Sequence, residues 1–212
     1  MIITLKHSNP FLSLCLIYRI ESNKKCLFVS GLVNLQYLDL SYNNISDIDP
    51  EAFKYLRHLR TLEIRRNSLT MVSDWTLPLR SLDILDIAQN CLVQLSSTLS
   101  LASLRELDVS DNMLVELSEE TLDSLVELKR LDLSYNKLSA VPPVSNMAGL
   151  TELSLSGNMI KTLDESSLAG LRALQVEFMR EYAPKRIFVI QDFIISMNVR
   201  EQNCIFLNLF KV

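Results

Sequence analysis

The stretch LKRLDLSYNKL, residues 128–138, contains a pattern that the chain repeats along most of its length. Written as L-x-x-L-x-L-x-x-N-x-L, with Ile or Val replacing some leucines, the string occurs in six segments whose first leucines are 24, 23, 22, 24 and 22 residues apart. The segments are Leu35–Ile45, Leu59–Leu69, Leu82–Leu92, Leu104–Leu114, Leu128–Leu138 and Leu150–Ile160. A regular period of this length predicts a solenoid of stacked units.

Within each unit, the apolar residues indicate a short strand. Leu131 and Leu133 alternate with Asp132, so one face of the strand is buried and the other is free. The Asn after each strand stands where the chain turns away, and its amide can both donate and accept hydrogen bonds. Leaving the backbone groups at such a bend buried and unpaired costs about 1–3 kcal/mol each. We therefore expect a structural ladder of Asn43, Asn67, Asn90, Asn112, Asn136 and Asn158.

The second half of each unit also carries apolar residues, eighteen and twenty-one positions after the first leucine. These are Phe53 and Leu56, Leu122 and Leu125, and Leu168 and Leu171. Over roughly residues 27–174 the chain resembles the leucine-rich repeat family, in the typical class of animal Toll-type receptor ectodomains and secreted matrix proteins. The resemblance implies an α/β solenoid, a right-handed superhelix with a parallel concave sheet and a mostly irregular or short-helical convex side.

The pattern divides the chain into three parts. Residues 27–175 form the expected repeat domain, with full repeats starting at 35, 59, 82, 104, 128 and 150. Residues 1–26 are interpreted as a degenerate N-terminal repeat or cap; a signal peptide is disfavoured because Pro10 precedes the apolar run and Arg19 interrupts it. Residues 176–212 are off-pattern and are expected to cover the open end of the solenoid. The alternative is a truncated form of a longer repeat protein.

Composition and charge bound the possible functions. An apolar content of 48% suffices for one continuous core. Residues 32–175 carry 20 acidic and 12 basic side chains, a net charge of −8, whereas residues 1–31 and 176–212 carry +3 and +1. An acidic solenoid argues against nucleic acid as a partner and is compatible with a basic protein or peptide. The apolar cluster Ile187–Ile195 is shorter than the ~20 residues of a membrane span, so no transmembrane segment is visible.

Cysteines and one sequon bear on localisation. Cys91 is expected to be packed and free, and Cys15, Cys26 and Cys204 do not form the closely spaced end caps that the resemblance implies for extracellular members. Asn44-Ile45-Ser46 is a glycosylation sequon, so Asn44 is a possible glycan site if the chain is secreted. We expect an extracellular or cell-surface location, with a cytoplasmic one as the alternative.

The sequence contains no recognisable catalytic motif. His7 and His58 are isolated, and no His, Cys and Asp cluster has the spacing of metal ligands. The chain has no phosphate-binding loop, no dinucleotide fingerprint and no G-x-S-x-G elbow. We therefore expect no enzymatic activity, no cofactor and no metal.

The free face of the predicted sheet is the candidate recognition surface. Its fifth repeat position carries Asp39, Glu63, Asp86, Asp108 and Asp132, then Ser154. Strands about 4.8 Å apart would align these carboxylates in a row. Arg60, Arg105, Lys129 and Arg130 are expected to offset the row. Either the row binds a basic partner, or it is ordinary solvated repeat consensus.

Tyrosine and arginine side chains flank the row, and both residue types are enriched among interface hot spots. The predicted partner-binding set is Tyr37, Asp39, Tyr42, Glu63, Arg65, Arg66, Asp86, Gln89, Asp108, Arg130, Asp132 and Tyr135. Within it, Tyr42, Arg65, Arg66 and Gln89 should form a patch across three units. The function expected is protein or peptide recognition; an intracellular scaffold or a receptor fragment is the alternative.

Overall fold

The computed structural model describes residues 33–72, 74–95, 101–160, 171 and 174 together with their side chains. It also describes the backbone of the strands at 4–6, 15–21, 24–30, 185–190, 193–198 and 203–207. The residues described in full cover the six segments that carry the repeat string, from Leu35–Ile45 to Leu150–Ile160.

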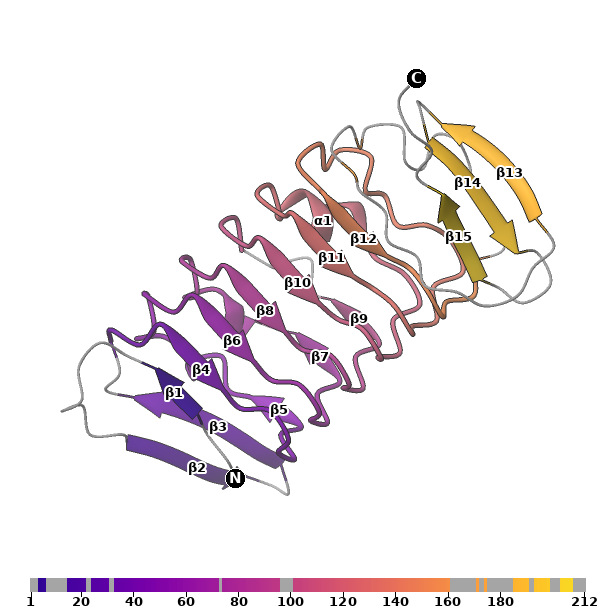
Figure 1. The fold of residues 1–212 in the computed structure, drawn as a ribbon. Coiled ribbons are helices and arrows are strands. Elements are labelled where there is room, and N and C mark those ends of the chain that lie inside the picture. Colours follow the sequence, from indigo (N-terminus) through magenta and orange to yellow (C-terminus); the bar gives the residue numbers. More distant parts are fainter. Residues whose placement is uncertain are drawn as a thin grey trace.

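The repeat strands form one parallel sheet in chain order (Figure 1). They are β4 (Tyr37–Asp39), β6 (Thr61–Glu63), β8 (Ile84–Asp86), β10 (Glu106–Asp108), β11 (Arg130–Asp132) and β12 (Glu152–Ser154). In every strand the central leucine is buried and the two flanking residues are at least partly exposed. The predicted solenoid with a parallel sheet is confirmed.

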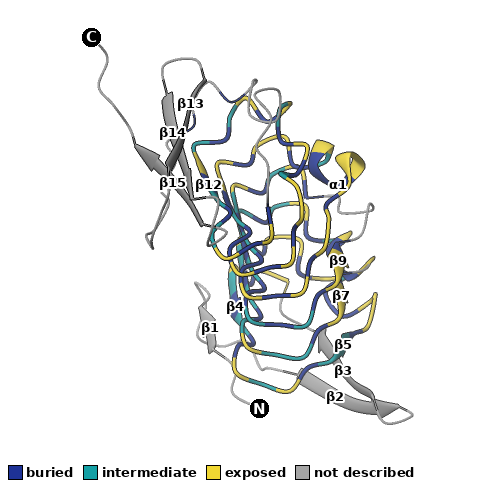
Figure 2. Cartoon of the chain, turned by 90° about the vertical axis from the view of Figure 1, so that its right-hand side faces the viewer, coloured by how far each residue is buried: buried dark blue, intermediate teal, exposed yellow. Residues whose placement is uncertain are grey.

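Short elements make up the opposite side of the solenoid, as the repeat pattern predicts. They are β5 (Asp47–Ile48), β7 (Met71–Val72), β9 (Gln94–Leu95), the 3-10 helix η1 (Asp74–Thr76) and the helix α1 (Glu119–Asp123). Ser118 caps α1 by accepting a hydrogen bond from the backbone N–H of Thr121. Figure 2 shows these elements on one side, the sheet on the other, and buried residues between them.

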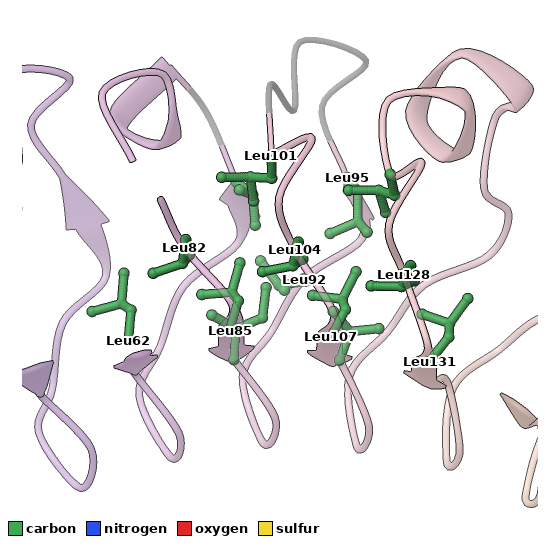
Figure 3. Packing of buried hydrophobic residues seen from close by; sticks show 14 of the residues in the cluster. Leu62, Leu82, Leu85, Leu92, Leu95, Leu101, Leu104, Leu107, Leu128 and Leu131 are labelled. Atoms are coloured by element: carbon green, nitrogen blue, oxygen red, sulfur yellow. The ribbon is translucent and has the colours of Figure 1, made fainter. Parts of the chain in front are cut away.

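The core is continuous from coil to coil. Leu62, Leu85, Leu107 and Leu131 are each at most 2% exposed, and they meet leucines of the neighbouring coils in the interior (Figure 3). On the outer arc, the rings of Phe53 and Trp75 pack edge to face with centroids 5.6 Å apart. Each coil therefore completes the interior of its neighbours, which a single coil cannot do. Leu168, predicted for the same arc, lies outside the described residues.

From the second coil onward, the asparagine that ends each strand joins two coils; Asn43 in the first coil donates to the Leu40 and Ser41 carbonyls of its own coil, at 2.8 and 3.0 Å. The Asn112 amide donates to the carbonyls of Ile87 in the previous coil and of Val109 and Ser110 in its own coil, at 3.2, 3.1 and 3.1 Å. Its Oδ1 accepts the N–H of Leu92 at 2.9 Å. Asn67, Asn90, Asn136 and Asn158 repeat this arrangement. The buried bends of successive coils are thus hydrogen bonded through one ladder of amides.

Strands outside the repeats pair differently. β1 (Thr4–Lys6) pairs antiparallel with β4 and so extends the first edge of the sheet. β2 (Cys15–Glu21) and β3 (Lys24–Ser30) are antiparallel, and β3 runs parallel to β5. β13 (Lys185–Ile190), β14 (Phe193–Asn198) and β15 (Asn203–Leu207) form an antiparallel sheet that Figure 1 shows beyond β12.

These pairings do not test the predicted domain boundaries, which stay predictions, as does the covering role of residues 176–212. The apolar run expected to begin at Phe11 lies partly outside the described residues. Within the described part of the chain, no helix is both long and apolar enough to cross a membrane.

Candidate recognition surface

The free side of the parallel sheet, which we call the sheet face, carries the predicted carboxylates in register. Strand pairing places Asp39 beside Glu63, Glu63 beside Asp86, Asp86 beside Asp108, and Asp108 beside Asp132. Ser154 ends this carboxylate row at β12. The residues two positions earlier form a parallel column, which runs from Tyr37 through Thr61, Ile84, Glu106 and Arg130 to Glu152.

Each aspartate of the row also has a local structural role. Its Oδ1 accepts the backbone N–H two residues further on, at 2.8 Å for Asp39, 2.9 Å for Asp86, 2.9 Å for Asp108 and 2.9 Å for Asp132. These bonds satisfy N–H groups where the chain leaves the strand. One oxygen of each carboxylate is therefore committed to the backbone, and the second is available for other contacts.

Arg65 supplies positive charge to the middle of the row. Its Nη1 lies 3.7 Å from Asp86 Oδ2 and 3.8 Å from Asp108 Oδ2. Burial raises the pKa of Asp86; its hydrogen bond from Ala88 lowers it, the charge of Asp108 raises it, and the charge of Arg65 lowers it. The positive charge of Arg65 thus offsets the repulsion between the carboxylates of Asp86 and Asp108 on adjacent strands.

Two arginines expected to offset the row have other partners. Arg60 Nη1 lies 3.0 Å from Asp83 Oδ2, and Arg130 Nε lies 3.2 Å from Glu152 Oε2. Neither pair involves a carboxylate of the row, so the offset expected from these two arginines stays a prediction. On β4, the pKa of Tyr37 is raised to about 12. Burial is the largest cause, and the hydrogen bond to Glu63 and the charges of Glu63 and Asp39 raise the pKa as well.

The residue before each ladder asparagine has a left-handed backbone conformation. Its φ is 58° at Tyr42, 53° at Arg66, 55° at Gln89, 54° at Asp111, 54° at Tyr135 and 67° at Gly157. We call this column the rim. Non-glycine residues adopt positive φ infrequently. Here the conformation recurs in all six coils because the chain makes the same turn after each strand.

Rim side chains contact one another across coils. The Arg66 guanidinium lies over the Tyr42 ring, 5.1 Å from its centroid. Arg66 Nε and Arg65 Nε both donate to Gln89 Oε1, at 2.6 and 3.0 Å. Gln89 Nε2 in turn donates to Asp111 Oδ2 at 3.1 Å. The structure therefore brings the predicted patch together.

Sequence reasoning missed two members of this surface, Asp111 and Gly157. Their position directly before a ladder Asn is the signal that points to the rim. Tyr135, which was predicted, lies on the same rim but four coils away from Tyr42, so the predicted set is one extended surface and not one cluster.

Other predicted features lie elsewhere. Asn44 is exposed, and Cys91 is half-buried and free. His58 is exposed, whereas His7 lies outside the described residues. Among the residues that the structure describes, no group of His, Cys, Asp and Glu side chains is arranged to hold a metal.

Comparison with family models gives matches along the repeats. The model described as "Leucine rich repeat" matches residues 27–69, 57–114 and 102–145, and the model described as "Leucine Rich repeats (2 copies)" matches residues 126–170. Together these matches cover the six repeated segments.

Individual proteins match shorter stretches. The chain is 34% identical over 74 residues to Tsukushi from Gallus gallus, a match that covers 35% of this chain and 20% of Tsukushi. It is 41% identical over 63 residues to Toll-like receptor 5 from Homo sapiens, covering 30% of this chain and 7% of the receptor. The chain thus spans a fifth or less of the length of these relatives.

Solved structures match over more of the fold. TLR13 in complex with the RNA ssRNA13 aligns with a TM-score of 0.65 at 26% identity, covering 69% of this chain and 21% of that one. Toll from the Toll–Spatzle complex of Drosophila aligns with a TM-score of 0.63 at 27% identity, covering 69% of this chain and 22% of that one. One of these neighbours is thus seen with RNA and the other with a protein.

Proposed function

Because this chain belongs to the leucine-rich repeat family, we propose that it is a non-enzymatic recognition module that binds a protein or peptide on the concave sheet face. The observation that carries the proposal is the linked patch of Tyr42, Arg65, Arg66 and Gln89. These side chains hold one another in place on a rigid sheet, so less conformational entropy is lost when a partner binds. Tyr and Arg are also the residues that contribute most often to interface energetics.

A protein partner is favoured over nucleic acid by the charge of the sheet face. Its central row is acidic, and the arginine at its middle, Arg65, already faces two carboxylates. Phosphate groups bind best to a basic surface. The earlier exclusion of nucleic acid nevertheless has no support from the comparisons, since TLR13 is seen with RNA. Binding to RNA is therefore an outcome that the test below must include.

We further propose that the chain is secreted or displayed at a cell surface, as part of a receptor-like or matrix-like protein. Its similarity to Tsukushi and to Toll-like receptor 5 supports this, and Asn44 is exposed as a glycan acceptor must be. Finding glycan on Asn44 in material from native cells would support the proposal. Unglycosylated Asn44 together with cytosolic fractionation would favour the alternative, an intracellular scaffold.

The capture of binding partners by immobilised chain tests the recognition surface. The variant Arg65→Glu/Arg66→Glu reverses two charges of the patch. The control Arg57→Glu/Arg80→Glu makes the same change of charge at two exposed residues of the outer arc. We expect the first variant to lose partners that the wild type and the control retain. Equal capture by both variants would contradict binding on the sheet face. If RNase treatment releases the partners captured by the wild type, the chain binds RNA and the proposal of a protein ligand is wrong.

A further inference from the structure

Two coils of the solenoid contain the same hexapeptide, LDLSYN, at residues 38–43 and 131–136. Its tyrosine has φ 58° at Tyr42 and 54° at Tyr135, and the two side chains are 62% and 65% exposed. The backbone N–H of each tyrosine donates to the next coil, to the Arg65 carbonyl at 2.8 Å and to the Ser156 carbonyl at 2.7 Å. The two sites therefore have the same backbone frame.

The neighbouring coil differs between the two sites. Beside Tyr42 it supplies Arg65 and Arg66, and the Arg66 guanidinium lies 5.1 Å from the ring centroid. Beside Tyr135 the same positions are Ser156 and Gly157. A Cβ on Gly157 would lie 2.6 Å from Tyr135 Cδ1, so the ring lies against the glycine backbone. Within the described residues, no cation stacks on Tyr135.

The carboxylate next to Tyr135 also lacks a cation. Asp132 Oδ1 accepts the Ser134 N–H at 2.9 Å and the Ser134 hydroxyl at 2.6 Å. Among the residues that the structure describes, none forms an ion pair with Asp132, and Arg130 on the same strand pairs with Glu152. A hollow of about 270 Å³ lies at β11 and β12, and Asp132, Ser154 and Ser156 line it together with the Arg130–Glu152 ion pair.

We infer that the surface of Tyr135 and Asp132 receives an arginine side chain from a protein partner, in the position that Arg66 fills over Tyr42. This inference rests on the proposed function and names the chemistry of the partner. A guanidinium offers a planar face that stacks on the Tyr135 ring and several N–H donors for a carboxylate. The hollow at β11 and β12, which Asp132 helps to line, leaves room for such a group beside this carboxylate.

Arginine peptides test the inference on the full chain. The wild type is titrated with a labelled oligo-arginine peptide and an oligo-lysine peptide of equal length, followed by fluorescence anisotropy. We expect the arginine peptide to bind more tightly, because stacking favours a guanidinium over an ammonium. Tyr135→Ala should weaken its binding about two- to five-fold, the loss of one exposed cation–π contact.

Tyr55→Ala is the matched control, because Tyr55 is an exposed tyrosine of the outer arc whose ring already has the Lys54 ammonium 5.2 Å from its centroid. It should change the affinity for the arginine peptide less than roughly two-fold. Asp132→Asn keeps an oxygen for the Ser134 N–H and removes only the charge, and it should weaken binding about two- to five-fold. Ser156→Arg, at a residue that lines the same hollow as Asp132, supplies a cation from within the chain and should weaken binding by a similar factor. Circular dichroism checks that each variant is folded.

Equal losses in Tyr135→Ala and Tyr55→Ala, or equal affinity for the two peptides, would overturn the inference. Such a result leaves the proposed function intact if Arg65→Glu/Arg66→Glu still loses partners that Arg57→Glu/Arg80→Glu retains. If that capture experiment fails while the peptide result holds, the arginine site exists but the patch around Tyr42 is not the recognition surface.

Discussion

At the scale of single residues, the ladder asparagines hydrogen bond the backbone where the strands end. Asn112 bonds to three carbonyls and one N–H, in two coils. Replacing it with Ala leaves buried backbone groups unpaired, which should lower the free energy of unfolding by about 1–3 kcal/mol. Urea denaturation measures the change. Asn44→Ala, at an exposed site, should stay within roughly 0.5 kcal/mol of wild type; losses of similar size in both variants would contradict the role of the ladder.

Gly157 makes a second prediction at this scale. Its φ of 67° and its contact with the Tyr135 ring both disfavour a side chain. Gly157→Ala should lower the free energy of unfolding by about 1–2 kcal/mol because of the left-handed conformation alone, and by more when the Tyr135 ring is present. In a Tyr135→Ala background the cost should fall, which thermal unfolding of the four chains of the mutant cycle would detect. An unchanged cost would mean that the ring does not restrict this site.

Sequence predicts part of this detail. An Asn at a fixed place in each repeat indicates an amide ladder, because few side chains can both donate and accept. The left-handed rim is marked only by its position directly before each ladder Asn and not by residue type, since Tyr, Arg and Gln occupy it where Gly or Asn would be expected. The contacts of Asp111 and Gly157 were missed because this position does not show which side chain of the neighbouring coil each one meets.

Among the strands, the carboxylate row is the feature with a measurable pH dependence. Arg65 lowers the pKa of Asp86, whose burial raises it. Removing the guanidinium by Arg65→Met should therefore raise the pKa of Asp86 further. A group whose pKa is raised by folding favours the folded state when protonated, and this contribution is lost as the pH rises through the raised pKa. The variant should thus be least stable, relative to wild type, at neutral pH.

Near pH 7 we expect Arg65→Met to lower the free energy of unfolding by about 0.5 kcal/mol. The value is small because Arg65 is partly exposed and its charge is screened by water. Near pH 3 the difference should shrink as Asp86 is protonated. Denaturant titrations at the two pH values measure both numbers. Arg105→Met, an exposed arginine without an ion pair among the described residues, should show no such dependence. A loss in Arg65→Met that is constant with pH would contradict the role assigned to the pair.

The rows of the sheet face follow from the sequence, because a period of two and a constant repeat put equal positions side by side. The partners within those rows do not. Arg65 reaches two strands away, to Asp108, while Arg60 and Arg130 turn to Asp83 and Glu152. Side-chain torsions decide between such neighbours, and repeat spacing contains no information about them.

For the whole molecule, the central property is one core shared by all coils. Leu107 lies in the middle of it, between leucines of the coils on either side (Figure 3). Leu107→Ala should cost about 2–5 kcal/mol and should destabilise the repeats together, because neighbouring coils lose the same contacts. Hydrogen exchange across the six repeats measures this. Val115→Ala, at a residue 50% exposed, should have little effect; destabilisation confined to the coil of Leu107 would contradict a shared core.

The regular period made the fold of the repeats predictable, since one unit determines its neighbours. It gave no information about the segments outside the repeats. The antiparallel pairing of β1 with β4 is an example, because the chain there has no repeat string to align. The structure of a non-repetitive segment depends on its own contacts, and few of these can be predicted from a single sequence.

The most direct test of the account is a footprint of the chain with a captured protein partner, using hydroxyl radicals and mass spectrometry. Tyr42 and Tyr135 report on the rim of the sheet face, and Tyr55 and Met71 report on the outer arc; all four are exposed. We predict that the partner protects Tyr42, Tyr135 or both and leaves Tyr55 and Met71 as reactive as in the free chain. Protection of Tyr55 and Met71, with Tyr42 and Tyr135 unchanged, would contradict recognition by the sheet face.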